Sequence, residues 1–292
     1  MRLGFHLSIA GSLLRAISEA QRLGCQALQI FVQNPRVWRW RQVDPAEVKD
    51  FIRARRRAGL GPLMVHLSYL PNLAASELVL QQQSAARLAR ELTLARALEA
   101  DYLVVHPGHG ELSEESFQRV ARTLGAAVLQ VPPPPLVLLE NTAGQGRELG
   151  WRPDQLQRIM DLSGVDLGLC LDTAHAFAAG FDLRSPAGVS LLLGEIAQGP
   201  GLERLKMLHL NDSKAALNSR VDRHWHLGLG HLGLAGLREF LAHPWLKPHG
   251  AIMETPKRHP ADDWRNLLTA RSLVPTLALR SPAAAARSAR RY

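Results

Sequence analysis

The sequence predicts an α/β fold, a closed (β/α)8 barrel in a single domain, and three observations support it. Short, almost continuously apolar runs recur eight times along the chain, as expected for strands that are buried on both faces. Longer stretches with helical spacing and charged faces separate these runs. The 292 residues suit one such barrel, which takes roughly 250 residues or more. An open, doubly wound sheet is the alternative.

The predicted elements alternate along the whole chain, which favours a parallel sheet with helices around it. The apolar runs predict strands at residues 3–8, 25–31, 62–68, 102–108, 136–142, 167–173, 205–211 and 251–256. The helical patterns lie at residues 12–24, 45–59, 76–100, 113–130, 152–163, 185–198, 233–243 and 260–273.

Capping residues mark several helix boundaries. Asp44 stands before Pro45, an arrangement typical of an N-cap followed by the first helical residue. Ser113 can cap the helix that follows it, with Ser116 and two glutamates in the first turn. Gly24 follows a helical pattern, as C-terminal caps often do. These signals support the predicted alternation of strands and helices.

The chain contains no linker that would divide it, so residues 1–275 are expected to form the barrel domain. Residues 276–292 are rich in Ala and Arg and lack a core pattern, so we expect a basic, disordered tail. The formal net charge is +9, and it is still +5 when the four arginines of the tail are left out. This basicity is compatible with a polyanionic partner.

Cysteine usage and hydropathy indicate an intracellular protein. Cys25 and Cys170 lie in apolar runs and are expected to be buried thiols, since nothing resembles a disulfide framework. No apolar run approaches the roughly 20 residues that span a bilayer. The first residues resemble a strand rather than a signal peptide. We therefore expect a cytoplasmic protein without membrane association.

Six consecutive predicted strands end at a side chain that can bind a metal ion. They are His66, His106, Glu140, Asp172, His209 and Glu254. Because the carboxyl ends of barrel strands share one rim, these side chains should converge. Two nearby motifs add three more: His175 follows Asp172 by three residues, and Asp222 and His224 form a D-x-H pair.

Each of these residues has a simpler explanation when it is considered alone. A histidine at a strand end is usually a hydrogen-bonded structural residue, Asp172 can cap the next helix, and Asp222 can form a surface ion pair with Arg223. Together, however, buried carboxylates and imidazoles would repel and desolvate one another without a cation. The convergence of all nine therefore favours a metal site.

The ligand set indicates the kind of metal and the kind of chemistry. Five histidines, two aspartates and two glutamates suit zinc, with manganese or iron as substitutes. Nine ligands exceed the need of one ion and suit a cluster of two or three ions with a bridging carboxylate. Such a cluster can polarise a phosphodiester and lower the pKa of water to about 7. The chain has no Ser-His-Asp elbow and no phosphate-binding P-loop.

Nine strings, in order from about residue 3 to residue 257, resemble the endonuclease IV family. They are HLSIAGSL (6–13), QNPRVWRW (33–40), HLSYLPNLA (66–74), HPG (106–108), LENTAGQGRELG (139–150), LDTAHAFAAGFD (171–182), HLNDSK (209–214), SRVDRHWHLGLGHLG (219–233) and METP (253–256). Two of these strings, ENTAGQG and DTAHAFAAGFD, are long and specific.

This resemblance implies a TIM barrel with a trinuclear zinc site. His66 and His106 would bind one zinc ion, and Glu140 would bridge it to a second, completed by Asp172, His209 and Glu254. His175, Asp222 and His224 would bind the third. Glu140 and Glu254 are the residues taken as catalytic.

The resemblance also implies a reaction. A zinc-bound hydroxide would hydrolyse the phosphodiester 5′ to an abasic site in double-stranded DNA, which leaves a 3′-hydroxyl and a 5′-deoxyribose phosphate. A 3′-phosphatase and 3′-repair diesterase activity would act on blocked 3′ ends. The protein would be a monomer that associates with the nucleoid through DNA binding.

The expected DNA contacts lie in loops of the same rim. Arg36, Tyr69 and Leu70 match positions that insert into the duplex near the lesion. Two tryptophans of the loop, Trp38 and Trp40, either pack on the DNA backbone or anchor the loop. Residues 35 and 37 depart from the family pattern because they are Pro and Val where polar residues are common. These two residues are expected to make the loop that carries Arg36 stiffer than its counterpart in the family.

Two other functions compete with this prediction. A sugar isomerase or epimerase has a similar barrel and a two-metal site, but it needs neither the third ligand set nor a basic chain. A non-catalytic DNA-binding barrel would be expected to have lost ligands, and this sequence retains all nine.

Overall fold

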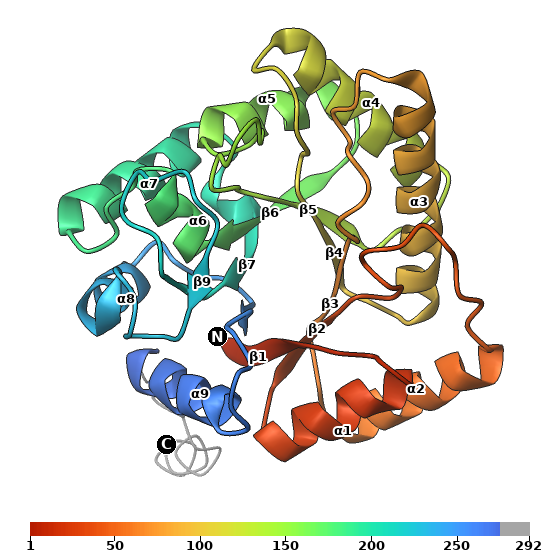
Figure 1. The fold of residues 1–292 in the computed structure, drawn as a ribbon, viewed down its shortest axis with the longest axis horizontal. Coiled ribbons are helices and arrows are strands. Elements are labelled where there is room, and N and C mark those ends of the chain that lie inside the picture. Colours follow the sequence, from red (N-terminus) through yellow and green to blue (C-terminus); the bar gives the residue numbers. More distant parts are fainter. Residues whose placement is uncertain (275–292) are drawn as a thin grey trace, which may run out of the picture.

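The computed structural model describes residues 1–274 and confirms the closed parallel barrel (Figure 1). The strands are hydrogen-bonded in the order β1-β10-β7-β6-β5-β4-β3-β2. Their bounds are β1 Arg2–Leu7, β2 Ala27–Ile30, β3 Leu63–His66, β4 Tyr102–Val105, β5 Leu136–Glu140, β6 Leu167–Asp172, β7 Leu205–His209 and β10 Gly250–Met253. The alternative of an open, doubly wound sheet is therefore wrong. The predicted tail, residues 276–292, lies outside the described residues.

Helices form the outer layer around the barrel (Figure 1). Those predicted from the sequence are α1 Leu13–Leu23, α2 Pro45–Arg57, α3 Leu78–Ala97, α4 Glu114–Leu129, α5 Pro153–Ser163, α7 Pro186–Gln198, α8 Gly233–Leu241 and α9 Asp262–Leu273. The predicted caps are confirmed. The side chains of Asp44 and Ser113 accept backbone N–H bonds in the first turns of α2 and α4, and Gly24 ends α1 in the left-handed conformation.

Four short elements were not predicted. They are helix α6 Thr173–Ala178, the 3-10 turn η1 Leu202–Arg204, and the antiparallel strands β8 Asp212–Ser213 and β9 His224–Trp225. Two or three residues carry no measurable periodicity, and α6 begins directly where β6 ends. The β8–β9 pair matters because it carries His224 to the rim of the barrel.

The interior of the barrel is built in layers. An apolar cluster fills its middle and comprises Ala27, Met64, Tyr102, Val104, Leu138, Cys170, Met207 and Ile252. Because side chains alternate between the two faces of a strand, the next inward position lies two residues further along. That position is His66 after Met64 and Glu140 after Leu138. A polar layer therefore lies directly on an apolar one.

Strands β1 and β2 complete this polar layer. Counting two residues on from Gly4 and from Ala27 gives His6 and Gln29, and both side chains contact Glu254. Each of the eight barrel strands thus has an inward polar side chain at or next to its carboxyl end, whereas the sequence predicted metal ligands on only six of them.

The two cysteines are buried and free, as predicted. Burial raises the pKa of Cys25 to about 11 and that of Cys170 to about 12, so both remain protonated thiols at neutral pH. Within residues 1–274, no helix is long and apolar enough to cross a membrane.

Gly4 provides a test of the barrel packing. A Cβ atom there would lie 1.9 Å from the carbonyl oxygen of Ala27. Gly4→Ala should therefore lower the free energy of unfolding by about 1–3 kcal/mol, measured by urea denaturation. The matched control is Gly194→Ala in α7, where nothing lies within 4 Å. Removing a helical glycine there should leave stability unchanged or raise it by up to about 1 kcal/mol. A fully stable Gly4→Ala variant would contradict the close β1–β2 packing.

Candidate metal centre

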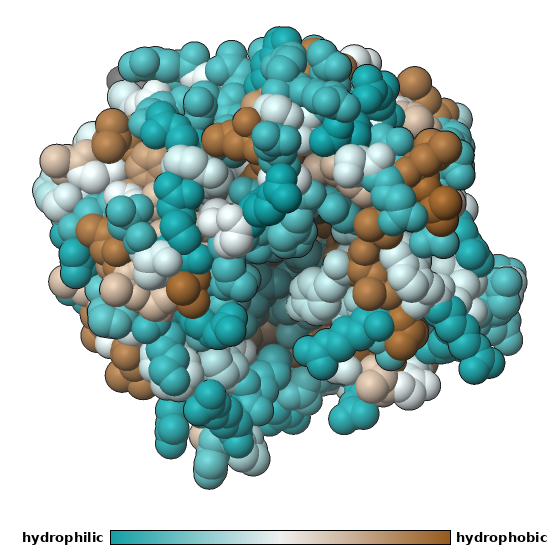
Figure 2. Space-filling view, turned by 45° about the horizontal axis from the view of Figure 1, so that its top comes forward, coloured by the Kyte–Doolittle hydropathy of each residue, from teal (hydrophilic) through white to brown (hydrophobic). Residues whose placement is uncertain are grey.

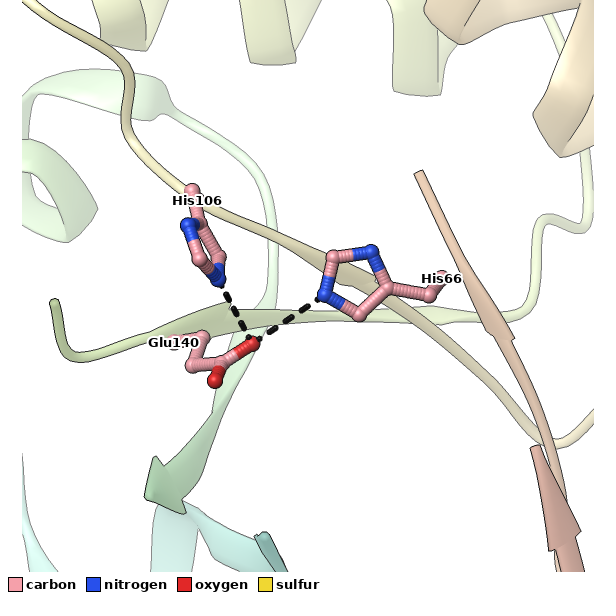
Figure 3. A group of neighbouring side chains, drawn as sticks. All are labelled: His66, His106 and Glu140. Atoms are coloured by element: carbon pink, nitrogen blue, oxygen red, sulfur yellow. Dashed lines mark ion pairs between the residues drawn. The ribbon is translucent and has the colours of Figure 1, made fainter. Parts of the chain in front are cut away.

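The rim of the barrel gathers the predicted ligands into three groups. The first consists of His66, His106 and Glu140, and Figure 3 shows both imidazoles turned toward the carboxylate. The Nε2 atoms of His66 and His106 lie 3.3 Å and 3.1 Å from Oε2 of Glu140. Glu140 is completely buried, whereas the His106 side chain is 31% exposed, so this group lies between the protein interior and the cleft.

The second group consists of Glu140, Asp172, His209 and Glu254. Nδ1 of His209 lies 2.8 Å from Oε1 of Glu140 and 3.2 Å from Oε2 of Glu254. Glu140 therefore directs one oxygen toward the first group and the other toward the second, which is the position a bridging carboxylate requires.

The third group consists of Asp172, His175 and His224. The Nε2 atoms of the two histidines lie 3.2 Å apart. Oδ2 of Asp172 lies 3.3 Å from Nε2 of His224. Asp222 stands beside this group, with Oδ1 3.3 Å from His175 Nε2 and 3.5 Å from His224 Nε2. Its side chain is 36% exposed, more than the others, because it approaches from a loop.

The hydrogen bonds around these groups leave lone pairs on His66, His175 and Glu140 without a hydrogen-bond donor. Nδ1 of His66 donates to the carbonyl oxygen of Leu67 at 2.7 Å, and Nδ1 of His175 donates to that of Asn141 at 2.9 Å. In a neutral imidazole the other nitrogen, Nε2, is then an acceptor, and in both residues it faces a carboxylate. Oε2 of Glu140 is buried without a hydrogen-bond donor. Converging acceptors of this kind require a cation, and the imidazole and carboxylate donor set fits zinc.

The electrostatics of the cluster support this conclusion. Burial alone would raise the pKa of Glu140, but His209 and His106 hold that pKa well below its ordinary value. Burial likewise lowers the pKa of His175, whereas Asp172 and other carboxylates raise it well above the ordinary value. The negative charge of the cluster therefore attracts cations strongly, and metal binding must displace protons from its histidines.

Two asparagines that the sequence did not single out hold the ligands in place. Asn141 exchanges two hydrogen bonds with the backbone of Asp172, at 2.7 Å and 3.1 Å. Nδ2 of Asn211 donates to Oδ2 of Asp172 at 2.7 Å, and its Oδ1 accepts from the backbone N–H of Glu254 at 2.8 Å. Asn141 follows Glu140 by one residue, and Asn211 follows His209 by two. Their place just after a predicted ligand at a strand end is the feature of the sequence that could have indicated their role.

Asp212 organises the loop that follows His224. Its buried carboxylate accepts five backbone N–H bonds, from Ser213, Gly228, Gly230, Leu232 and Gly233. The β8–β9 pair joins Asp212 to Trp225. One carboxylate thereby closes the loop and fixes the strand that carries His224.

The expected DNA-contacting residues lie at the mouth of the site. Tyr69 is 61% exposed, and its ring meets Phe31 edge to face at 5.1 Å between centroids. The N–H of Tyr69 donates to the carbonyl oxygen of Pro35, which ties it to the loop that carries the exposed Arg36. Leu70 is half-buried. Their contact with DNA remains a prediction.

Two cavities meet at this mouth, and hydrophilic residues surround a hollow near the middle of the face in Figure 2. A cleft of about 320 Å³ contains ligands of all three groups. An adjoining cavity of about 640 Å³ shares His6, Phe31, Tyr69 and Lys257 with the cleft. Its lining adds three arginines, Arg36, Arg39 and Arg41. Positive charge therefore borders the cleft on this side.

A buried ion pair holds the arginine-bearing loop. Arg87 and Glu91 of α3 are 4% and 0% exposed and lie 2.5 Å apart. Oγ of Ser68, two residues beyond His66, donates to Glu91 at 2.5 Å. Arg87 also donates to three carbonyl oxygens of the loop, those of Asn34, Val37 and Trp38. The pair thus connects the loop to the end of strand β3.

The two tryptophans of this loop differ in environment. The ring of Trp40 lies against the guanidinium groups of Arg87 and Arg90, at 5.3 Å and 4.2 Å from its centroid, which favours anchoring. Trp38 is 40% exposed and is accessible to a partner.

Comparison with known proteins places the chain in a family. Residues 17–272 match the family described as xylose isomerase-like TIM barrel. A probable endonuclease 4 of Methanoculleus marisnigri is 41% identical over 278 residues, which cover 93% of this chain and 98% of the relative. The chain belongs to the endonuclease IV family. A second endonuclease 4 relative, from Solibacter usitatus, is 42% identical over 281 residues, with 94% and 97% covered.

Solved structures agree with this assignment. Endonuclease IV of Thermus thermophilus superposes with a TM-score of 0.84 at 41% identity, covering 94% of this chain and 98% of that one. A D-tagatose 3-epimerase-like protein superposes with a TM-score of 0.70 at 20% identity over 94% and 97%. The second likeness shows only that this endonuclease IV family member shares its fold with sugar epimerases.

The Arg87–Glu91 pair yields a stability prediction. Arg87→Met leaves the Glu91 carboxylate buried without its cation, so the free energy of unfolding should fall by about 3–5 kcal/mol, measured by urea denaturation. Arg90→Met is the matched control, because Arg90 contacts the same tryptophan from an exposed position and should cost about 1 kcal/mol or less. Equal, small losses in both variants would show that the buried pair does not hold the loop.

Proposed function

We propose that this protein is a metal-dependent endonuclease that acts on abasic DNA. It hydrolyses the phosphodiester 5′ to the abasic site: water adds to phosphorus, the bond to the 3′ oxygen breaks, and a 3′-hydroxyl and a 5′-deoxyribose phosphate result. We further propose that it works as a monomer and also repairs blocked 3′ ends. The observation that carries the proposal is the convergence of nine imidazoles and carboxylates on one cleft in a chain of the endonuclease IV family.

The donor set fits three zinc ions, with manganese or iron as substitutes. His66, His106 and Glu140 would hold one, and Glu140 would share the second with Asp172, His209 and Glu254. His175, Asp222 and His224 would hold the third, with Asp172 close by. When bound, such ions supply Lewis acidity, stabilise negative charge on phosphate oxygens and lower the pKa of water to about 7.

The chain's own residues supply position and charge. Glu140 lies between the first two groups, with one oxygen facing each of them, so it fixes their separation. Glu254 borders the cleft, and Oδ1 of Asn211 accepts a hydrogen bond from its backbone N–H at 2.8 Å, so its side chain can orient a reacting group there. Both are therefore proposed as catalytic residues.

The mouth of the cleft suits damaged DNA. Cations of the adjoining cavity, Arg36 among them, can contact phosphates, which supply most of the affinity for nucleic acids. The exposed ring of Tyr69 and the neighbouring Leu70 offer an apolar surface that can replace stacked bases. A sugar without its base is the least costly to turn out of the duplex, and it would enter the cleft beside the three groups.

The direct test uses a duplex with one tetrahydrofuran abasic analogue, which hydrolysis can cut but β-elimination cannot. The zinc-loaded protein should cut on the 5′ side of the analogue and leave a 3′ end that a polymerase extends. Prolonged chelation should abolish cutting, and added zinc should restore it. If metal-replete protein leaves the duplex intact, the sugar isomerase or epimerase function becomes the better explanation of the site.

Arg36→Ala tests the loop separately from the metals. Loss of one phosphate contact should weaken binding of abasic duplex and reduce the slope of log affinity against log salt by about 1, measured by fluorescence anisotropy. Zinc content should be unchanged. Arg57→Ala is the control, since it removes the same charge from the exposed C-terminal end of α2, at the opposite end of the barrel. Equal effects of the two substitutions would refute a specific role for Arg36.

Glu254→Gln tests the catalytic assignment. The amide keeps the size of the side chain but removes the charge that faces His209. Cleavage should slow by more than ~100-fold, because even partners outside the ligand shell contribute 10–100-fold, while affinity for abasic duplex is retained. Single-turnover cleavage and anisotropy measure the two quantities. Cutting at the wild-type rate would show that Glu254 has been assigned wrongly.

A further inference from the structure

Gln29 is a buried polar residue beside the proposed metal centre, and the proposed reaction gives it no role. It lies on strand β2 and is completely buried, at the inward position that matches the ligands of other strands. A buried amide with all its partners inside the metal centre has a specific arrangement to maintain, because each unsatisfied polar atom there would cost about 1–3 kcal/mol.

The surroundings fix the orientation of this amide. One of its terminal atoms lies 2.7 Å from Oε1 of Glu254 and 2.9 Å from Nδ1 of His6. A carboxylate can only accept, so this atom is the NH2 nitrogen. The other atom, the oxygen Oε1, lies 2.8 Å from Nε2 of His209.

The amide orientation determines which nitrogen of His209 is free. An oxygen acceptor beside Nε2 requires a proton on Nε2. In the neutral ring Nδ1 then carries the lone pair, and Nδ1 is the atom that faces Glu140 and Glu254. Gln29 also donates a hydrogen bond to Oε1 of Glu254. The other oxygen, Oε2, faces Nδ1 of His209 in the second group. Gln29 therefore orients both His209 and Glu254 toward the centre of the second group.

We propose that Gln29 is a positioning residue of the metal centre, which sets the His209 tautomer and the Glu254 orientation for the second ion. This inference rests on the proposed metal-dependent function, since it assumes that the second group binds an ion. Outer partners of this kind typically contribute 10–100-fold to metal affinity. Loss of Gln29 should therefore weaken one ion of the cluster and leave the others in place.

The test measures zinc affinity and stoichiometry by competition with a chromophoric chelator and by elemental analysis. Gln29→Met keeps the length of the side chain but removes both hydrogen-bonding functions. It should lower the affinity for one zinc ion by about 10–100-fold. Gln29→Asn, one methylene shorter, cannot span from His209 to Glu254 and should act in the same direction.

The matched control is Gln33→Met. Gln33 is also a buried glutamine with two hydrogen bonds, but both go to the backbone of Arg41, so zinc affinity should not change. Folded Gln29 variants that bind every ion as the wild type does would overturn the proposal. A wild-type protein that binds no zinc would instead overturn the metal-dependent function itself.

A measurement on the unaltered protein decides the point even if the variants do not fold. In the zinc-loaded protein, long-range ¹H–¹⁵N spectra should show His209 protonated on Nε2, with that proton protected from exchange. The signal is assigned by nuclear Overhauser contacts between this proton and the side-chain protons of Gln29, whose Oε1 lies 2.8 Å from Nε2 of His209. A His209 that is protonated on Nδ1 would refute the role of Gln29.

Discussion

The structure depends on the compensation of charge at the end of the barrel. Carboxylates and imidazoles from six strands meet where neither water nor other polar groups can solvate them fully, and Glu140 stands at their centre. Isolated buried charges of this kind cost several kcal/mol each. The arrangement is stable only with cations among the side chains, whether protons or metal ions. The same requirement that constrains the fold therefore creates the site.

The closed barrel makes this concentration of charge possible. Parallel strands bring their carboxyl ends to one rim, and the two-residue alternation turns the last inward side chain of each strand toward the axis. The apolar layer just below, which includes Met64 and Leu138, excludes water from underneath. Hydrogen bonds from Asn141, Asn211 and Gln29 then leave the ligands little freedom to rotate.

The outer wall of the site is also held by buried polar contacts. The Arg87–Glu91 pair lies under the loop of residues 33–41 and reaches both this loop and Ser68. Because Ser68 lies between His66 and Tyr69, a proposed metal ligand and a surface aromatic share one support. A stable wall of this kind can hold a DNA duplex at a fixed distance from the cleft.

Much of this organisation can be predicted from the sequence. Apolar runs that end in His, Asp or Glu predicted the strands and six of the proposed ligands, because a polar residue at the end of a buried run is conspicuous. Gln29 and His6 were harder to recognise, since they lie within apolar runs and only the count along each strand shows that they face inward. Strands β8 and β9 are too short to produce a pattern. Arg87 and Glu91 resemble an ordinary exposed pair at helical spacing, and only packing against the loop shows that they are buried.

A crystal structure of the zinc-loaded protein, with anomalous data collected on both sides of the zinc edge, tests the trinuclear centre most directly. We expect three zinc peaks at the carboxyl end of the barrel, two of them sharing Glu140. Their ligands would be His66, His106 and Glu140; Glu140, Asp172, His209 and Glu254; and His175, Asp222 and His224. A centre without zinc peaks, or with Glu140 bound to none, would contradict this expectation.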